Sequence, residues 1–430
     1  MSEGYKVGLS RNRLFEFNNA VTFCGKLAEV DKESLSRALK LLCLKEPVIT
    51  TVAVIGEDGE CSIVPESVEQ ELVFSGESAR EIKCGFAENG LCFSKKLFEF
   101  VVSCDGFLVI AAHTLVADCK SLLRLAMAFS SLCKAGATSV VPSCVEVFSD
   151  MTGLPLEVNS PLTDKLAAEL DDGWQRVSQV FTEADYKMAR ARYCESRKFS
   201  DEVALELDSA CTSKLLSFCE EQGADLSSVV AFAFYKALCD KLKPTKKQGR
   251  ACIHADRRLF LQDCENVLVG PFNGFCEASL NTKEMALDLK GQIKAFHNSC
   301  YKGVTSPFKT FYDEVLFMKT SPSYCDSAYM YLAGCVKDKA PRKLAQNYGC
   351  MNEQLCEFFS CNLEQKYWSE LKSYSDISVS EPLKERFGAS ISLLRVDGAC
   401  KITLRFNERR VDKSCAEAVI SGAKSILEQI

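Results

Sequence analysis

Apolar segments typical of β-strands alternate with amphipathic segments typical of α-helices, and this alternation limits the fold of the chain more than any other feature. In the first half, strands are predicted at 15–23, 97–103 and 107–113, and the last two are joined by a Cys-Asp-Gly turn that indicates a hairpin. Helices are predicted after Asp31, a candidate cap, and over 119–134. Strands that alternate with helices predict the α/β or α+β class.

The second half of the chain shows the same alternation. Strands are predicted at 202–207 and 251–255, and a pair of strands is predicted within 389–406. Helical spacing of apolar residues predicts helices at 226–242 and at 413–429. The second half therefore has the elements for a mixed sheet of its own.

A stretch that contains three prolines separates the two halves. Residues 136–174 mix these prolines with Gly, Ser and Thr, a composition typical of an inter-domain connection. A chain of 430 residues is also long enough for two large units. We therefore expect two lobes of similar size, residues 1–180 and residues 181–430.

The charge balance and the apolar runs exclude several classes of partner. The 52 Lys+Arg and 58 Asp+Glu give a net charge of −6, whereas nucleic acids and anionic membranes attract basic surfaces. The longest apolar run, 107–117, is too short to span a bilayer, and the first residues lack the apolar core of a signal peptide. We expect a cytoplasmic, monomeric protein that binds neither nucleic acid nor membrane.

Cysteine is unusually frequent, with 24 residues, but its spacing indicates no metal site. The closest pair is Cys356 and Cys361, and no C-x-C or C-x-x-C occurs, although structural zinc and iron–sulfur sites commonly use such pairs. Most cysteines lie in apolar segments, where they act as small hydrophobic residues. We expect reduced thiols, no metal and no tightly bound cofactor.

Histidine is rare, so candidates for imidazole chemistry are few: the chain has only His113, His254 and His297. His113 ends a predicted strand, Asp118 follows five residues later, and a helix begins there. From these residues alone, a core histidine beside a helix-capping Asp is the favoured interpretation. His297 lies on a predicted helix and is expected at its surface.

The segment around His113 resembles the HHxxxDG motif of the condensation domains of nonribosomal peptide synthesis. Their relatives include CoA-dependent acyltransferases and alcohol acetyltransferases with the chloramphenicol-acetyltransferase-like fold. The strand, turn, strand, motif and helix of that family match LFEFVVSCDGFLVIAAHTLVADCKSLL, with Ser121 at the serine that follows the motif. Further segments that resemble the family occur in the same order over almost the whole chain, among them CIHADRRLFL, VLVGPFNGF and FFSCNLEQ.

The resemblance implies two lobes that form a V with a central tunnel. It also implies an activity: transfer of an acyl group from a pantetheine thioester to an amine or an alcohol. The thioester would be carried by CoA or by an acyl carrier protein, so CoA or phosphopantetheine would be a substrate rather than a resident cofactor.

The motif departs from the family at its catalytic position. His113 falls on the first histidine of HHxxxDG, but Thr114 stands where the second, working histidine is expected, and Cys119 replaces the glycine. A threonine hydroxyl is neither basic nor acidic near neutral pH, so Thr114 cannot act as a general base. His113 cannot replace it unless the strand bulges, because adjacent strand side chains point to opposite faces.

The remaining candidates come from the second lobe. In the family, the Asp at the position of Asp118 makes a structural ion pair with an Arg; the candidates here are Arg257 and Arg258, and the D-x-R spacing favours Arg258. His254 lies four residues before Arg258, on the same strand face, and is either a displaced base or a structural histidine.

Two functions remain open from the sequence. One is an acyltransferase whose missing histidine is replaced by substrate positioning and a displaced base. The other is a non-catalytic pseudoenzyme that binds an acyl-pantetheine arm or a partner protein.

Overall fold

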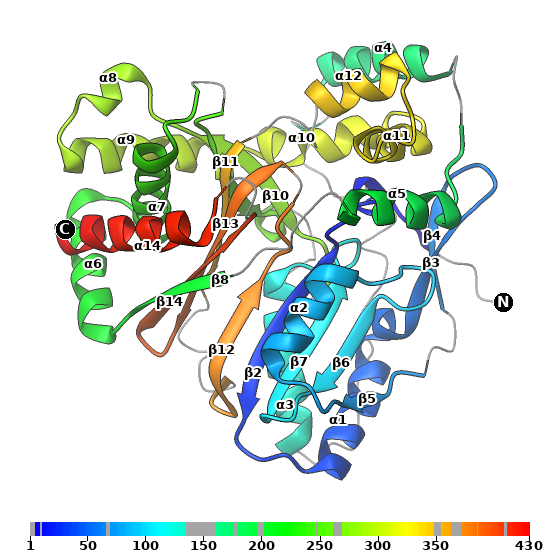
Figure 1. Ribbon diagram of the computed structural model, residues 1–430, viewed down its shortest axis with the longest axis horizontal. Helices are drawn as coiled ribbons and strands as arrows, with labels where there is room; N and C mark the ends of the chain where they lie inside the picture. Colours follow the sequence, from blue (N-terminus) through cyan, green and yellow to red (C-terminus); the bar gives the residue numbers. More distant parts are fainter. Residues whose placement is uncertain are drawn as a thin grey trace.

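Two sheet-centred lobes and a helical layer make up the chain in a computed structural model (Figure 1). The structure describes residues 5–8, 11–65, 69–134, 158, 160–175, 179–195, 202–245, 248–260, 269–347, 354–362, 371–384, 386–407 and 411–430. Much of the predicted connection at 136–174 therefore lies outside the described residues.

The first lobe is built on a five-stranded mixed sheet in the order β12-β2-β7-β6-β5. The strands are β12 (Tyr374–Ser380), β2 (Ala20–Leu27), β7 (Phe107–His113), β6 (Phe98–Val102) and β5 (Leu72–Phe74). All neighbours are antiparallel except β5 and β6. The predicted hairpin of β6 and β7 is present.

Helices cover both faces of this sheet. Helices α1 (Lys32–Lys45) and α3 (Cys119–Lys134) pack together over one face, and α2 (Ala79–Asn89) packs on the other. Asp31 caps α1 as predicted, because its side chain accepts the N–H of Glu33.

The predicted strand at 15–23 was wrong in its first part. β2 begins at Ala20, and the residues before it have irregular backbone. Phe15 and Phe17 are nevertheless fully buried, and both rings pack against the ring of Tyr186. The alternation of Phe15 and Phe17 therefore reflects core packing rather than strand pairing. Burial of large aromatic rings is stabilising whether or not the backbone that carries them forms a strand.

The second lobe is built on a six-stranded mixed sheet in the order β10-β9-β11-β13-β14-β8. Its strands are β10 (Asn273–Ala278), β9 (Ala251–Asp256), β11 (Gln354–Asn362), β13 (Phe387–Val396), β14 (Ala399–Phe406) and β8 (Glu202–Leu207). β11 is parallel to both of its neighbours, and the other pairs are antiparallel.

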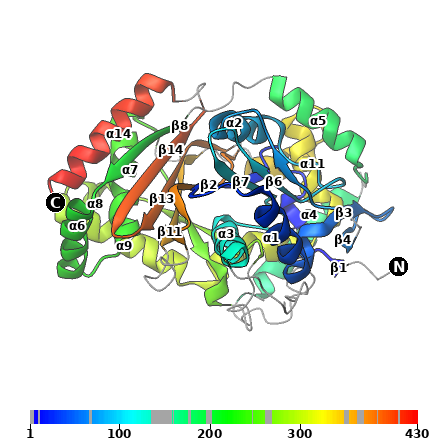
Figure 2. The ribbon, with the colours of Figure 1, turned by 90° about the horizontal axis from the view of Figure 1, so that it is seen from below.

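The two faces of this second sheet differ in polarity. One face is apolar and is covered by α6 (Ser209–Gln222), α7 (Leu226–Leu242), α9 (Leu289–Val304) and α14 (Lys413–Glu428). Figure 2 shows these helices on the outer side of the sheet, away from β2 and β7. The opposite face carries His254, Glu357, Ser390 and Arg405 and looks toward the first lobe.

The remaining elements form a small antiparallel sheet, the helical layer at the top of Figure 1, and short helices. They are β1 (Tyr5–Lys6), β3 (Thr51–Ile55), β4 (Cys61–Pro65), α4 (Pro161–Gln175), α5 (Glu183–Glu195), α10 (Pro307–Met318), α11 (Pro322–Leu332), α12 (Lys339–Asn347), α8 (Thr282–Met285), η1 (Arg11–Arg13), η2 (Pro47–Thr50) and η5 (Arg257–Leu259). No described helix is long and apolar enough to cross a membrane.

One strand crosses between the lobes. β12 comes from the last quarter of the chain, yet it pairs with β2 in the first-lobe sheet, where Figure 1 shows it in orange beside the blue β2. The chain then passes through 381–386 into β13 of the second sheet. Part of the expected second lobe therefore completes the first, and the boundary at residue 180 stays a prediction.

Candidate functional site

His113 ends β7 and is a core residue. The register of β2 with β7 runs without a bulge from Lys26 opposite Phe107 to Ala20 opposite His113. The ring is fully buried; its Nδ1 accepts the N–H of Leu115 at 3.0 Å and its Nε2 lies 3.0 Å from Asn19 Nδ2. Burial lowers the pKa of His113 to about 3, so the imidazole is neutral and weakly basic.

This burial predicts an acid-labile contribution to stability. In the unfolded chain the imidazole binds a proton near pH 6.5, whereas in the folded chain it stays neutral down to about pH 3, so stability falls as the pH falls through this window. Between pH 7 and pH 5 we expect His113 to remove about 2 kcal/mol. His113→Gln should therefore lose about that much less stability than the wild type, as measured by urea unfolding at both pH values. An equal loss in the two proteins would contradict the buried neutral imidazole.

Thr114, which the resemblance places at the position of a working histidine, offers no base. Its side chain is buried, with 1% of the residue exposed, and its N–H donates to the carbonyl oxygen of Asn19 at 2.8 Å. Thr114 Oγ1 has no hydrogen-bond partner among the described residues. The position is therefore occupied by an unpaired hydroxyl group.

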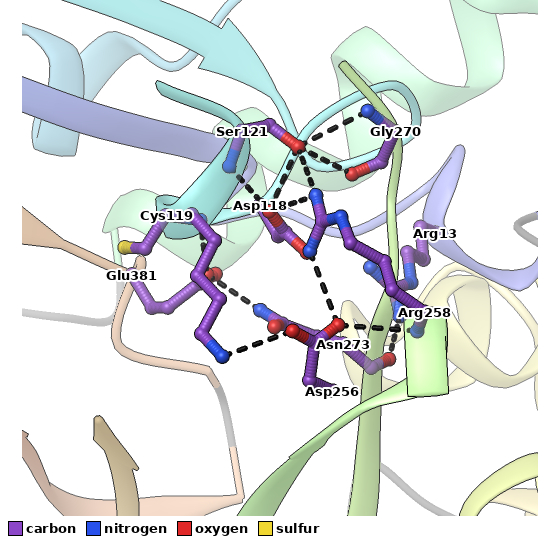
Figure 3. A network of polar contacts seen from close by, with 10 residues as sticks. Arg13, Asp118, Cys119, Ser121, Asp256, Arg258, Gly270, Asn273 and Glu381 are labelled. Carbon is purple, nitrogen blue, oxygen red and sulfur yellow. Dashed lines mark hydrogen bonds and ion pairs between the residues drawn. The ribbon is translucent and has the colours of Figure 1, made fainter. Parts of the chain in front are cut away.

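Asp118 and Arg258 are brought together between the lobes (Figure 3). Arg258 Nη1 lies 3.1 Å from Asp118 Oδ2, and Arg258 Nη2 lies 3.1 Å from Asp118 Oδ1. Asp118 Oδ1 also accepts the N–H and the hydroxyl of Ser121 at 2.7 and 2.8 Å. The carboxylate is fully buried, so this two-pronged pair holds the start of α3 against the second lobe.

Ser121 and Asp256 extend this network on both sides of the ion pair. Ser121 Oγ lies 2.8 Å from the carbonyl oxygen of Gly270 and accepts the N–H of Gly270 at 3.1 Å. Asp256 accepts from Arg258 at 3.2 Å and from Lys120 Nζ at 2.9 Å. Two first-lobe side chains, from the start of α3, thus contact the second lobe directly.

Arg257, the other candidate partner of Asp118, points elsewhere. It forms a buried ion pair with Glu314 on α10, and its Nε donates to the carbonyl oxygen of Thr310 at 2.9 Å. Glu314 also lies 3.5 Å from Arg13. The two neighbouring arginines therefore anchor different elements, and Asp118 pairs with Arg258.

Glu381 joins the lobes at the start of α3, and sequence reasoning missed it. Its Oε1 accepts the N–H of Cys119 at 3.0 Å and the side-chain amide of Asn273 at 2.6 Å. Burial raises the pKa of this carboxyl. No signal in the sequence indicated this role for Glu381. The residue reaches the start of α3 because β12, which precedes it, pairs with the first-lobe sheet.

His254 on β9 faces Glu357 on β11. Its Nε2 lies 3.1 Å from Glu357 Oε2, and the two side chains are 4% and 0% exposed. Glu357 was not predicted as a site residue, although a carboxylate within the apolar segment LCEFFSC was a visible signal. His297 is remote from this face: it lies on α9, where its Nδ1 contacts Asp225 at 3.0 Å and Ser228 at 3.2 Å.

No described group of His, Cys, Asp and Glu side chains is arranged to hold a metal ion. The described cysteines are free thiols, and burial raises the pKa of several, including that of Cys276 to about 12. Such thiols are poor nucleophiles near neutral pH.

A cavity of about 700 Å³ lies between β12 and the β13–β14 hairpin. Its apolar lining includes Tyr374 and Ile377 of β12, Leu394 and Val396 of β13, and Leu427 of α14. Its volume is within the range of small-molecule sites. The central tunnel implied by the resemblance stays a prediction.

No family model matches the chain, and no curated protein matches it in sequence. Solved structures do match it. They include the epimerization domain of the third module of tyrocidine synthetase B, at 15% identity and a TM-score of 0.60 over 99% of this chain and 97% of that one. The cyclization-docking bidomain from Sorangium cellulosum matches at 13% identity and a TM-score of 0.64, over 98% of this chain and 83% of that one.

The solved structure of an acetyltransferase also matches the chain. Trichothecene 15-O-acetyltransferase from Fusarium sporotrichioides matches at 11% identity and a TM-score of 0.64, over 98% of this chain and 94% of that one. Likeness at these identities shows the fold alone, and it extends over nearly the whole chain.

Proposed function

Because this chain has the fold of condensation, epimerization and acetyltransferase domains, we propose that it binds an acyl-pantetheine thioester between its two lobes. The donor would be an acyl-CoA or an acyl carrier protein, and the ancestral chemistry is acyl transfer to an amine or an alcohol. In this proposal no imidazole at position 114 takes part, so the family's histidine catalysis is lost.

The ion pair between Asp118 and Arg258 carries this proposal. It is buried and joins the two lobes through the Asp of the altered motif. Apolar side chains stabilise a buried contact between lobes at least as well as an ion pair does. We therefore attribute the charged pair to a need to hold the two lobes together around the space between them.

A non-catalytic role is the second candidate, and the state of Thr114 favours it. The motif supplies no base, because Thr114 is buried with a hydroxyl that has no partner in the described part of the chain, and His113 is held in the core. A pseudoenzyme of this kind would bind the acyl-pantetheine arm, or a partner protein, without turnover.

Thermal unfolding in the presence of pantetheine probes tests the binding step. We expect acetyl-CoA and acetyl-pantetheine both to raise the unfolding temperature, with a gain of about 2.7 kcal/mol at a concentration 100 times the Kd. Adenosine 3′,5′-bisphosphate, which lacks the pantetheine arm, serves as the control and should give a smaller shift. If neither acetyl probe shifts the transition at millimolar concentration, the proposed function fails for both classes of donor.

A further inference from the structure

The pair formed by His254 and Glu357 combines burial with incomplete hydrogen bonding on both side chains. Both side chains are enclosed, and they meet through one contact, from Nε2 to Oε2 at 3.1 Å. His254 Nδ1 and Glu357 Oε1 are buried and have no hydrogen-bond partner among the described residues. Buried polar atoms are normally satisfied, so two orphaned atoms on one pair call for an explanation.

A buried imidazole nitrogen without a hydrogen-bond partner is suited to exchange a proton with a ligand. If Nε2 carries the ring proton and donates it to Glu357, then the lone pair of Nδ1 is free. A carboxylate that orients an imidazole in this way fixes its tautomer and stabilises the imidazolium formed when the other nitrogen takes a proton.

The surroundings of the pair strengthen its electrostatics. The ring of Phe275 meets the imidazole edge-on at 4.6 Å between centroids, and the ring of Phe359 lies at 5.8 Å. Aromatic walls exclude water, and charge interactions are stronger in such surroundings than in solvent.

The pair also lies beside the motif. His254 is two residues from Asp256 on the same face of β9, a step of about 7 Å, and Asp256 contacts both Lys120 and Arg258. Glu381, which accepts the N–H of Cys119, is close enough to His254 for the imidazole charge to act on its pKa. The pair therefore adjoins the lobe junction where Asp118 of the motif meets Arg258.

We propose that His254 is the catalytic acid–base of this chain and that Glu357 is its positioning residue, in place of the histidine missing at position 114. This rests on the proposed function, because the substrate is the same acyl-pantetheine thioester. His254 Nδ1 takes the proton from the attacking O–H or N–H of the acceptor as its oxygen or nitrogen bonds to the thioester carbonyl carbon. The carbon–sulfur bond then breaks, and the imidazolium returns the proton to the leaving thiolate.

The cavity between β12 and the β13–β14 hairpin is lined in part by the sheet face that carries the pair. Leu394 lines this cavity, and Ser390, on the same face of β13, pairs in register with Glu357. Four residues of strand span about 13 Å, so in this proposal a substrate held in the cavity has to extend about that far along the strand face to reach His254.

The histidine on α9 provides a matched control. His297 also contacts a carboxylate, that of Asp225, but Asp225 caps α7 and about half of its side chain is exposed. A histidine–carboxylate contact by itself therefore does not indicate catalysis. The combination of enclosure, orphaned atoms and proximity to the motif is what distinguishes His254.

Cleavage of acetyl-CoA in water, followed by chromatography of the released CoA, tests the proposal. Reagents that titrate thiols are unsuitable because the chain carries 24 cysteines of its own. We expect His254→Gln to lower kcat by 10²- to 10⁴-fold with little change in KM, the range for loss of a general base. Glu357→Gln should lower kcat less, also at constant KM, and His297→Gln should leave both constants unchanged.

The outcomes separate this inference from the proposed function. If wild type shows the thermal shift with acetyl-CoA but does not cleave it, or cleaves it equally well as His254→Gln, the dyad is not catalytic and binding still stands. If wild type shows no shift with either acetyl probe, the proposed function itself fails. Should His254→Gln not fold, as judged by circular dichroism, the isosteric Glu357→Gln carries the test, and an unchanged kcat in that variant overturns the proposal.

Discussion

We expect Arg258→Met to lower the free energy of unfolding by about 3–5 kcal/mol, because it leaves the Asp118 carboxylate buried without its cation. Asp118 is fully enclosed, and without Arg258 its donors among the described residues are the N–H and hydroxyl of Ser121. Methionine replaces the aliphatic part of the side chain and can still pack near Phe272, over whose ring the guanidinium lies at 4.2 Å. The loss should therefore come from charge rather than from packing.

Substitution of the acidic member of the pair should lower the free energy of unfolding less. Asp118→Asn leaves Arg258 with a second carboxylate, that of Asp256 at 3.2 Å, so we expect a loss of about 1–3 kcal/mol. Urea unfolding followed by circular dichroism measures both variants, and Arg37→Met on the exposed surface of α1 is the control, within about 0.5 kcal/mol of wild type. Equal effects of Arg258→Met and Arg37→Met would show that the ion pair does not hold the lobes.

The second large effect concerns Thr114, at the position where the resemblance places the working histidine. In a protein that already carries His254→Gln, we expect Thr114→His to restore acetyl-CoA cleavage by about 10²-fold or more, the lower end of what general-base catalysis supplies. The reason is that position 114 follows β7 directly and precedes Asp118, as the working histidine does in the family that the segment resembles. Chromatography of released CoA measures the gain.

A matched control separates the effect of a larger side chain at position 114 from the effect of a basic nitrogen there. Thr114→Gln in the same background adds similar volume without a basic nitrogen and should restore nothing. Both larger side chains overpack a buried site, so a stability loss of about 1–3 kcal/mol is expected in each. If Thr114→His folds, binds acetyl-CoA and still cleaves no faster than Thr114→Gln, position 114 does not face the thioester.

The local elements of this protein follow from short-range pattern. The hairpin of β6 and β7, the helix after Asp118 and the final helix after Asp412 were predictable, because strand alternation, helical spacing and capping residues act within a few positions. The unbulged course of β7 up to His113 was predictable for the same reason, whereas Thr114 lies in the turn that follows the strand.

The partners of buried charges were decided only by tertiary structure. Asp118 and Arg258 are 140 positions apart, and a family resemblance was needed to propose their pairing. Nothing in the sequence indicated that Arg257, its neighbour, would turn to Glu314, or that Glu381 would reach the start of α3.

The crossing of β12 explains most of this difference. Sequence by itself determined many of the strands and helices, such as β6, β7 and α3, because those choices depend on near neighbours. It did not predict β12. It could not determine that a strand from residues 374–380 would leave its own half to pair with β2, since strand pairing depends on edges that exist only once both sheets have formed. That crossing places Glu381 at the lobe junction. The register of β9 with β11 places Glu357 beside His254. The site is therefore formed by contacts between segments that are distant in the sequence.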